Sequence, residues 1–235
     1  MKNESICVIP ARGGSKRIPN KNVIDLNGKP MIAYTIEAAK ASRLFKRIIV
    51  STDDREIANI SKRYGAEVPF LRKSYHDDHS PVSLATLYTL EQAEEYYEER
   101  YDHLIQLLPS CPFRDSDVIV QAYQHFINTQ NKLQISVFKF GWMNPWWALK
   151  IEENGEPTPF FTEAVKARSQ DLIDLYCPTG AVWIANIPDL KKEKTFYGSG
   201  YRVYEINWMK AIDIDTEEDL NMAKALLQVK NQFQE

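Results

Sequence analysis

Residues 5–22 read SICVIPARGGSKRIPNKN, a short apolar run followed by two adjacent glycines among basic side chains. An apolar run of this length is typical of a strand buried on both faces of a parallel sheet. The glycines after it allow a backbone to approach a ligand closely. In open α/β sheets, ligands bind beyond the carboxyl ends of the strands. We therefore predict that this segment forms the first strand and main ligand loop of an α/β fold.

Beyond this segment, short apolar runs alternate with amphipathic stretches. The apolar runs predict strands at residues 5–9, 47–51, 67–71, 103–108 and 134–139, and regular structure resumes at 180–186. The amphipathic stretches predict helices at residues 31–41, 54–64, 83–97, 116–128 and 216–229. Asp53 and Glu56 have the spacing of a capping box at the start of the second helix. This alternation predicts a mostly parallel, doubly wound sheet with helices on both faces.

The composition limits the class of protein. With 235 residues, 44% of them hydrophobic, the chain suits one domain spanning residues 1–235. The net charge of −3 provides no basic field, so we expect no nucleic-acid partner. No apolar stretch reaches the ~20 residues that span a bilayer, and the first residues lack the features of a secretory signal. We expect a cytoplasmic protein without a membrane partner. Its three cysteines and four histidines form no metal-binding pattern.

The glycine-rich loop carries Arg12, Lys16, Arg17 and Lys21, four positive charges within ten positions. Arginine binds phosphate oxygens with a planar fork, lysine acts as a point charge, and successive backbone N–H groups can form an anion nest. Neither GxxxxGK[ST] nor GxGxxG is present, which argues against the ATPases and dinucleotide oxidoreductases that use those motifs. The alternative is a solvated basic turn. The position after the first strand favours a triphosphate.

Two aspartates near the carboxyl end, Asp213 and Asp215, alternate with Ile212 and Ile214. In a strand, this period puts both carboxylates on one face. Carboxylates facing a triphosphate could hold Mg²⁺, which takes oxygen ligands from protein and phosphate together. For Asp215 an equally weighted alternative is that it caps the final helix, in a capping-box-like arrangement with Glu218.

Between residues 141 and 178 the strand–helix pattern breaks. This stretch is rich in proline, glycine and polar residues, and it also carries Trp142, Trp146, Trp147, Phe160, Phe161 and Tyr176. Aromatic side chains outside a core commonly mark a surface for a partner. We predict an arm that protrudes from the domain.

The chain resembles the acylneuraminate cytidylyltransferases, which have the Rossmann-like fold of the nucleotide-diphospho-sugar transferases. The resemblance begins in the glycine-rich loop and spans almost the whole chain. Its later motifs are residues 27–31 (NGKPM), 49–53 (IVSTD), 109–114 (PSCPFR), 168–172 (RSQDL), 180–184 (GAVWI) and 212–217 (IDIDTE). It implies transfer of CMP from CTP to the anomeric hydroxyl of a nine-carbon nonulosonic acid, with release of pyrophosphate. The acid would be N-acetylneuraminic, legionaminic or pseudaminic acid.

The resemblance, together with the charge of the loop, assigns roles to individual residues. Expected nucleotide contacts are Ala11, Arg12, Gly13, Gly14, Ser15, Lys16, Lys21, Asn22 and Arg72. Expected catalytic residues are Arg12, Lys21 and Asp213, with Mg²⁺ on Asp213 and Asp215. Expected sugar contacts are Leu108, Pro109, Ser110, Arg168, Gln170 and Tyr176. Family members are homodimers whose arms reach the neighbour's site, so Arg168, Gln170 and Tyr176 would contact the partner's substrate.

Simpler interpretations remain beside these assignments. Arg72 could be a surface arginine, Asn22 a cap, and Arg168 an ion-pair partner of Asp171 or Glu163. Apolar Leu108 stands where sialic-acid enzymes of the family have glutamine, and Thr179 where they have asparagine, so sugar discrimination should differ. Transfer to the eight-carbon acid Kdo, or uridylyl transfer to a sugar phosphate, is a second enzymatic possibility. A nucleotide-binding scaffold without turnover is the non-enzymatic one.

Overall fold

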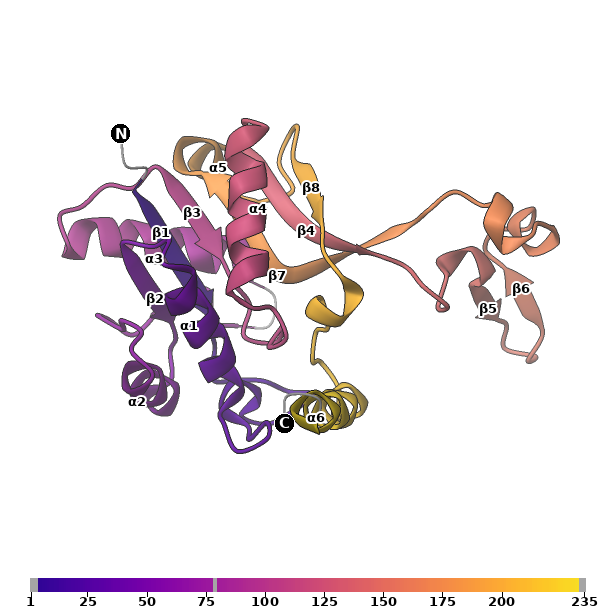
Figure 1. The fold of residues 1–235 in the computed structure, drawn as a ribbon, viewed down its shortest axis with the longest axis horizontal. Helices are drawn as coiled ribbons and strands as arrows, with labels where there is room; N and C mark the ends of the chain where they lie inside the picture. Colours follow the sequence, from indigo (N-terminus) through magenta and orange to yellow (C-terminus); the bar gives the residue numbers. More distant parts are fainter. Residues whose placement is uncertain (1–3, 78–79, 233–235) are drawn as a thin grey trace.

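The computed structural model describes residues 4–77 and 80–232, and in this part of the chain six strands form one sheet (Figure 1). Its strand order is β2-β1-β3-β7-β4-β8. The strands are β1 (Ser5–Pro10), β2 (Arg47–Ser51), β3 (His103–Gln106), β4 (Leu133–Lys139), β7 (Tyr176–Asn186) and β8 (Arg202–Glu205). Only β7 runs antiparallel to its neighbours within the described sheet. The predicted mostly parallel α/β fold is confirmed.

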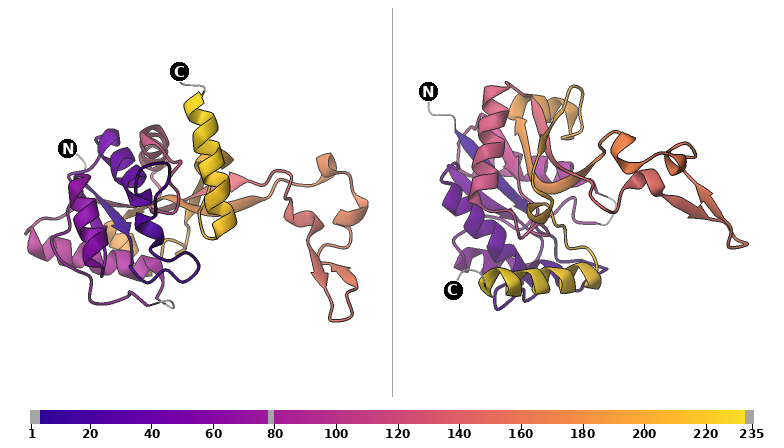
Figure 2. Two further views of the ribbon diagram at one scale, coloured as in Figure 1. Left: turned by 90° about the horizontal axis from the view of Figure 1, so that it is seen from below. Right: turned by 45° about the vertical axis from the view of Figure 1, so that its right-hand side comes forward.

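Helices cover both faces of this sheet (Figures 1 and 2). They are α1 (Met31–Ser42), α2 (Arg55–Arg63), α3 (Val82–Tyr96), α4 (Ser116–Asn128), α5 (Ile187–Glu193) and α6 (Glu217–Gln232). Alternate residues of β1 enter two separate cores: Cys7 packs with α1, α2 and α4, whereas Val8 packs with α3 and α5. Burial on both faces explains why β1 is apolar from Ile6 onward. No helix in the described ranges is long and apolar enough to cross a membrane.

A third, smaller apolar cluster joins the two ends of the chain. It contains Ile18 and Leu26 from the amino-terminal loop, Ile212 and Ile214 from the segment before α6, and Leu220 from α6. The short helical turn η1 (Lys21–Val23) lies in the same loop. Burial of these side chains holds residues 12–22 beside residues 212–215, although about 190 positions separate them in the sequence.

One predicted strand, at residues 67–71, is absent, and the segment with the paired aspartates is not a strand either. Glu67 forms only an isolated bridge with Ile49, and the chain then leaves the sheet edge, because Pro69 has no N–H to continue the ladder. Residues 212–215 are irregular, although Ile212 and Ile214 are buried as the alternation predicts. The predicted cap is also wrong by one residue. Asp54 caps α2 by accepting the N–H groups of Glu56 and Ile57.

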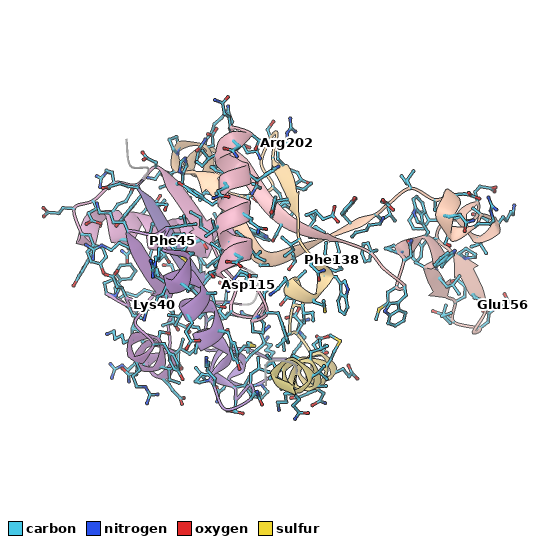
Figure 3. All side chains as sticks on the ribbon, viewed as in Figure 1. Lys40, Phe45, Asp115, Phe138, Glu156 and Arg202 are labelled. Atoms are coloured by element: carbon cyan, nitrogen blue, oxygen red, sulfur yellow. The ribbon has the colours of Figure 1, made fainter. Side chains whose placement is uncertain are left out.

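The break in the pattern corresponds to an arm that extends away from the sheet between β4 and β7 (Figures 1 and 2). It contains the strands β5 (Leu149–Ile151) and β6 (Pro157–Pro159) and the helical turns η2 (Pro145–Trp147), η3 (Ala164–Lys166) and η4 (Ser169–Asp171). Phe138 marks β4 near the base of the arm, and Glu156 marks its outer end (Figure 3). The arm ends slightly earlier than predicted, because Tyr176–Pro178 already pair with β4.

Candidate active site

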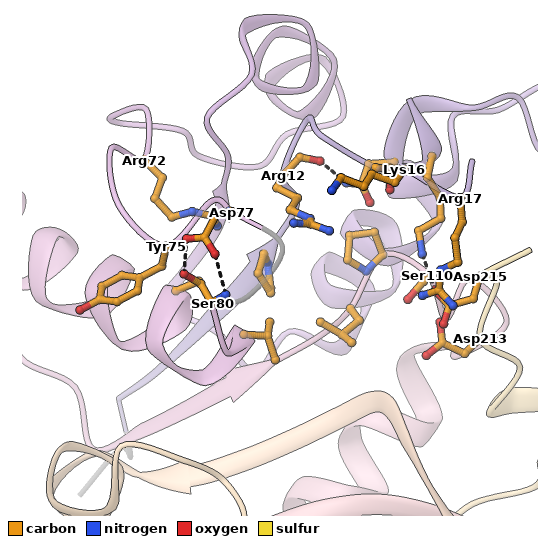
Figure 4. Close-up of a pocket in the computed structure, with 18 residues that line it drawn as sticks. Arg12, Lys16, Arg17, Arg72, Tyr75, Asp77, Ser80, Ser110, Asp213 and Asp215 are labelled. Carbon is orange, nitrogen blue, oxygen red and sulfur yellow. Dashed lines mark hydrogen bonds and ion pairs between the residues drawn. The ribbon is translucent and has the colours of Figure 1, made fainter. Parts of the chain in front are cut away.

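A cavity of about 590 Å³ lies where β1 and β3 end, at the edge of the sheet where the sequence predicts a ligand (Figure 4). It is bounded by the glycine-rich loop, the loop after β3 and the segment before α6. In Figure 4, Asp213 and Asp215 lie at one side, Tyr75, Asp77 and Ser80 lie at the other, and Arg12 and Lys16 lie between them. The paired aspartates thus lie at one end of the cavity, and the segment that leads into α3 lies at the other.

Most of the expected site residues line this cavity. They are Arg12, Ser15, Lys16, Lys21, Asn22, Arg72, Leu108, Pro109, Ser110, Asp213 and Asp215. Ala11, Gly13 and Gly14 belong to the same loop but are not among the lining residues, and neither are Arg168, Gln170 and Tyr176. Arg17, one of the four basic residues of the loop, had no predicted site role but also lines the cavity. Sequence reasoning missed the opposite end, formed by Tyr75, Asp77, Ser80, Val82 and Ala85. The only available signal was a polar loop before a predicted helix.

The glycine-rich loop is held by hydrogen bonds to neighbouring segments. The Ala11 N–H donates to the carbonyl of Ser51 at 2.8 Å, and the Asn22 amide donates to the carbonyl of Arg12 at 2.9 Å. The Gly13 N–H donates to Asp53 Oδ1 at 3.0 Å, so Asp53 shapes the loop instead of capping α2. A Cβ on Gly13 would lie 3.0 Å from the Cβ of Asp54, so a larger residue here would have to displace Asp54 slightly.

Lys21 links the loop to the aspartate segment. Its Nζ donates to Asp215 Oδ1 at 2.8 Å and to the carbonyl of Ile214 at 2.9 Å. Arg17 Nη2 lies 2.9 Å from the same Asp215 oxygen. The alternative cap role of Asp215 is wrong, because α6 begins with a reciprocal pair formed by Thr216 and Asp219. Asp215 therefore points its charge at the basic loop.

Asp213 is the more buried of the two carboxylates. Burial raises its pKa, the nearby charge of Asp215 adds to this rise, and hydrogen bonding by Ser110 and the charge of Lys21 oppose it. Its Oδ1 is buried without a hydrogen-bond partner among the described residues. A buried carboxylate oxygen without a partner destabilises the folded protein, unless a ligand binds to that oxygen.

The two carboxylates fit a magnesium ion that is shared with a substrate. Mg²⁺ is commonly bound by one or two carboxylates together with substrate phosphates, and the orphaned Asp213 oxygen provides a hard ligand of this kind. Within residues 4–77 and 80–232, no group of three or more His, Cys, Asp or Glu could hold a metal by itself. Any metal here would need ligands from the substrate or from water.

Arg72 is buried at the side of the cavity. Its Nη1 donates to the carbonyl and hydroxyl oxygens of Ser51 at 3.0 and 2.9 Å. Burial lowers its pKa, while the charge of Asp53 opposes that change. The interpretation as a surface arginine is therefore wrong.

The pattern of the family described as Cytidylyltransferase matches residues 6–233. The chain belongs to this family. A pseudaminic acid cytidylyltransferase of Campylobacter jejuni is 36% identical over 233 residues, with 99% of each chain covered. CMP-N,N'-diacetyllegionaminic acid synthase of Legionella pneumophila is 30% identical, with 97% of each covered. The structure of CMP:2-keto-3-deoxy-manno-octonic acid synthetase complexed with CTP covers 97% of this chain and 100% of its own. Its TM-score is 0.70 at 17% identity, so it shows the shared fold alone.

In this cytidylyltransferase the expected sugar clamp, Arg168, lies in the arm. Its Nε and Nη2 donate to the two carboxylate oxygens of Asp171 at 2.8 and 3.1 Å, as the simpler interpretation predicted. Both residues are exposed. Because the arm extends away from the sheet, Arg168 does not line the cavity of its own chain.

Proposed function

We propose that this nucleotidyltransferase transfers CMP from CTP to the anomeric hydroxyl of a nonulosonic acid and releases pyrophosphate. One observation carries the proposal: the basic loop around Arg12 and Lys21 and the carboxylates Asp213 and Asp215 line a single cavity. Basic side chains suit the phosphates and carboxylates suit the metal ion, so the two groups together suit a magnesium–triphosphate. Kdo transfer is less favoured, because the nonulosonate relatives are 30–36% identical over nearly the whole chain.

In the proposed reaction, the anomeric oxygen bonds to the α-phosphorus as the bond from that phosphorus to pyrophosphate breaks and the hydroxyl loses its proton. Positioning and charge stabilisation supply most of the catalysis in such transfers. Arg12 and Lys21 stabilise the charge on the α-phosphate and the departing pyrophosphate, and Lys16 binds the outer phosphates. Mg²⁺, held by Asp213 and Asp215, would polarise the α-phosphate. The opposite end of the cavity, around Tyr75 and Ser80, leaves space for the nucleoside.

Pseudaminic acid is the sugar that we favour. The relative at 36% identity is a pseudaminic acid cytidylyltransferase, whereas the legionaminate relative is 30% identical. In the loop after β3, the apolar side chain of Leu108 lines the cavity at a position where a polar side chain could form a hydrogen bond with the sugar. Loss of one polar contact is enough to change discrimination among sugars.

The assay that tests this function measures pyrophosphate release from CTP or UTP with a panel of acidic sugars. We expect release with CTP and the highest kcat/KM with pseudaminic acid. Release with Kdo alone, or only from UTP with a sugar phosphate, would contradict the proposal. CTP binding by calorimetry without any release would instead support the scaffold alternative.

We also propose that the arm joins two copies of the chain in the cytoplasm. Trp142 and Phe160 expose 85% and 66% of their surfaces in the single chain, which a partner surface would cover. The cysteines Cys7, Cys111 and Cys177 are free thiols, as suits a reducing compartment.

Replacement of Trp142 and Phe160 by serine is expected to convert dimer to monomer in sedimentation velocity, because both side chains are free to serve as interface anchors. Circular dichroism should remain unchanged, since neither residue is in the core. Tyr96→Ser is the control: Tyr96 is also exposed, but it ends α3, across the sheet from the arm (Figure 1). A variant that sediments like the original protein would argue against arm-mediated dimerisation.

A further inference from the structure

Arg114, two residues before α4, is a buried cation that the proposed reaction does not use. Its side chain is only 1% exposed. Its Nε and Nη2 have no hydrogen-bond partner among the described residues, and no ion pair of Arg114 with a carboxylate occurs in that part of the chain. Burial lowers its pKa. Buried charges are normally paired, and apolar residues of similar size are often as stable. Stability alone therefore does not account for arginine here.

The atoms that Arg114 does bind belong to two segments beside the cavity. Its Nη1 donates to the carbonyl of Leu108 at 3.2 Å and to that of Ala181, in β7, at 3.0 Å. The Leu108 N–H donates to the carbonyl of Gly180 at 3.1 Å. A Cβ on Gly180 would lie 2.2 Å from Leu108 Cδ1, so the two segments are as close as glycine permits. Arg114 thus fastens the loop after β3 to β7.

The part of β7 that contacts this loop, between Thr179 and Trp183, is irregular. Its register with β4 shifts between Ile135 and Ser136, and the Ser136 hydroxyl crosses the irregularity by donating to the carbonyl of Thr179 and accepting the N–H of Val182. Such bulges commonly lie beside active sites and redirect the chain. Here the bulge turns the carbonyl of Ala181 to Arg114.

The loop held by Arg114 leads directly to Asp213. The carbonyl of Ser110 accepts the N–H of Ile214 at 2.8 Å, and Ser110 and Asp213 both line the cavity. A separate contact, from the Thr179 hydroxyl to the carbonyl of Ala211 at 2.9 Å, ties the same bulge to the chain just before Asp213. The position of Asp213 therefore depends on β7 through two connections.

We propose that Arg114 is a positioning residue for the transfer reaction: its guanidinium fixes the Leu108–Ser110 loop on β7, and through the hydrogen bond between Ser110 and Ile214 it sets the place of Asp213. This inference rests on the proposed function only for its effect on turnover. A guanidinium suits the task because its charge is spread over a planar, weakly hydrated group whose Nη1 reaches both carbonyl oxygens, whereas a lysine ammonium is a compact, strongly hydrated point charge.

The test compares Arg114→Met, which has an unbranched apolar side chain, with Arg114→Lys. For methionine, kcat should fall about 10–100-fold, as for other groups that orient a site residue, while the Kd for CTP stays within about threefold. Lysine should recover part of the loss. Arg47→Met is the control, because Arg47 binds Glu67 and Glu99 at the opposite end of β2 from the cavity. Its kcat should be unchanged.

A second readout does not require turnover. The Ile214 N–H donates to the carbonyl of Ser110, so loss of the loop's position should weaken this hydrogen bond and speed hydrogen exchange of the Ile214 amide. Nitrogen-15 NMR at a single pH measures this exchange. Arg114→Met should exchange faster at Ile214 than the original protein, Arg114→Lys should be intermediate, and Arg47→Met should not differ.

The inference is overturned if exchange of the Ile214 amide is unchanged in both Arg114 variants, or if kcat falls only with the folded fraction. Should the methionine variant not fold, the lysine variant supplies the same comparison. If the original protein releases no pyrophosphate with any sugar, the proposed function fails, and exchange of the Ile214 amide alone then decides the role of Arg114.

Discussion

Asp213→Asn is expected to lower kcat by roughly a thousandfold, because it removes a charge aimed at the place where the proposed metal and α-phosphate meet. The same change should raise the melting temperature at neutral pH. Asparagine is similar in size and carries no charge, so the cost of burying an ionised carboxylate disappears. Activity and stability should therefore move in opposite directions.

The pH dependence follows from the raised pKa of Asp213. A carboxyl whose pKa is higher in the folded than in the unfolded chain favours folding at pH values below the unfolded pKa, about 3.9, and this contribution is lost as pH rises through the folded pKa. The melting temperature of Asp213→Asn should therefore exceed that of the original protein by more at pH 8 than at pH 5. Thermal melts at the two pH values measure the difference.

Asp215→Asn is the matched control, with the opposite effect on stability. The carboxylate of Asp215 is paired with both Lys21 and Arg17, so its neutralisation leaves two cations close together and should lower the melting temperature. An Asp213→Asn protein that keeps near-normal turnover at saturating Mg²⁺, or that melts lower at pH 8, would show that the assignment of Asp213 is wrong.

Lys21→Met is the second variant for which we expect a large effect, a fall in kcat of about 10²–10³-fold. Lys21 would stabilise charge on the transferred phosphate, and its Nζ also joins Asp215 to the glycine-rich loop. Its loss leaves the carbonyl of Ile214 without this donor, which should also lower the free energy of unfolding, by about 1–3 kcal/mol. Steady-state kinetics and denaturant titration measure the two effects.

Lys29→Met controls for the loss of a lysine near the same loop. Lys29 binds Glu37 at 2.6 Å and is not among the residues that line the cavity. Its replacement should leave kcat within about twofold, because Lys29 does not line the cavity. The protein should also stay folded, since a surface ion pair contributes only about 0–1 kcal/mol to the free energy of unfolding. If Lys21→Met and Lys29→Met behave alike, Lys21 has no role in the chemistry.

The sequence predicted the elements best where periodicity was strong. The ranges predicted for β2 and α4 agree with the structure residue for residue, because apolar side chains at strand or helix spacing leave little choice of conformation. Prediction failed where neighbours in space decide the outcome. The short run after Glu67 has strand-forming residues, but Pro69 interrupts its ladder, and Asp53 turned out to bind Gly13 instead of starting a helix.

The order of elements, the basic glycine-rich loop and the paired aspartates follow from the sequence alone, because residue type and local spacing determine charge and conformation over a few positions. Only the tertiary structure decided that the loop and the aspartates share one cavity, that Arg17 and Lys21 neutralise Asp215, and that Arg114 is buried behind the site. The physical reason is that burial of Ile18 and Leu26 against Ile212 and Ile214 joins distant segments. The hydrophobic effect is non-directional, so no local sequence pattern shows which distant segments will pack together.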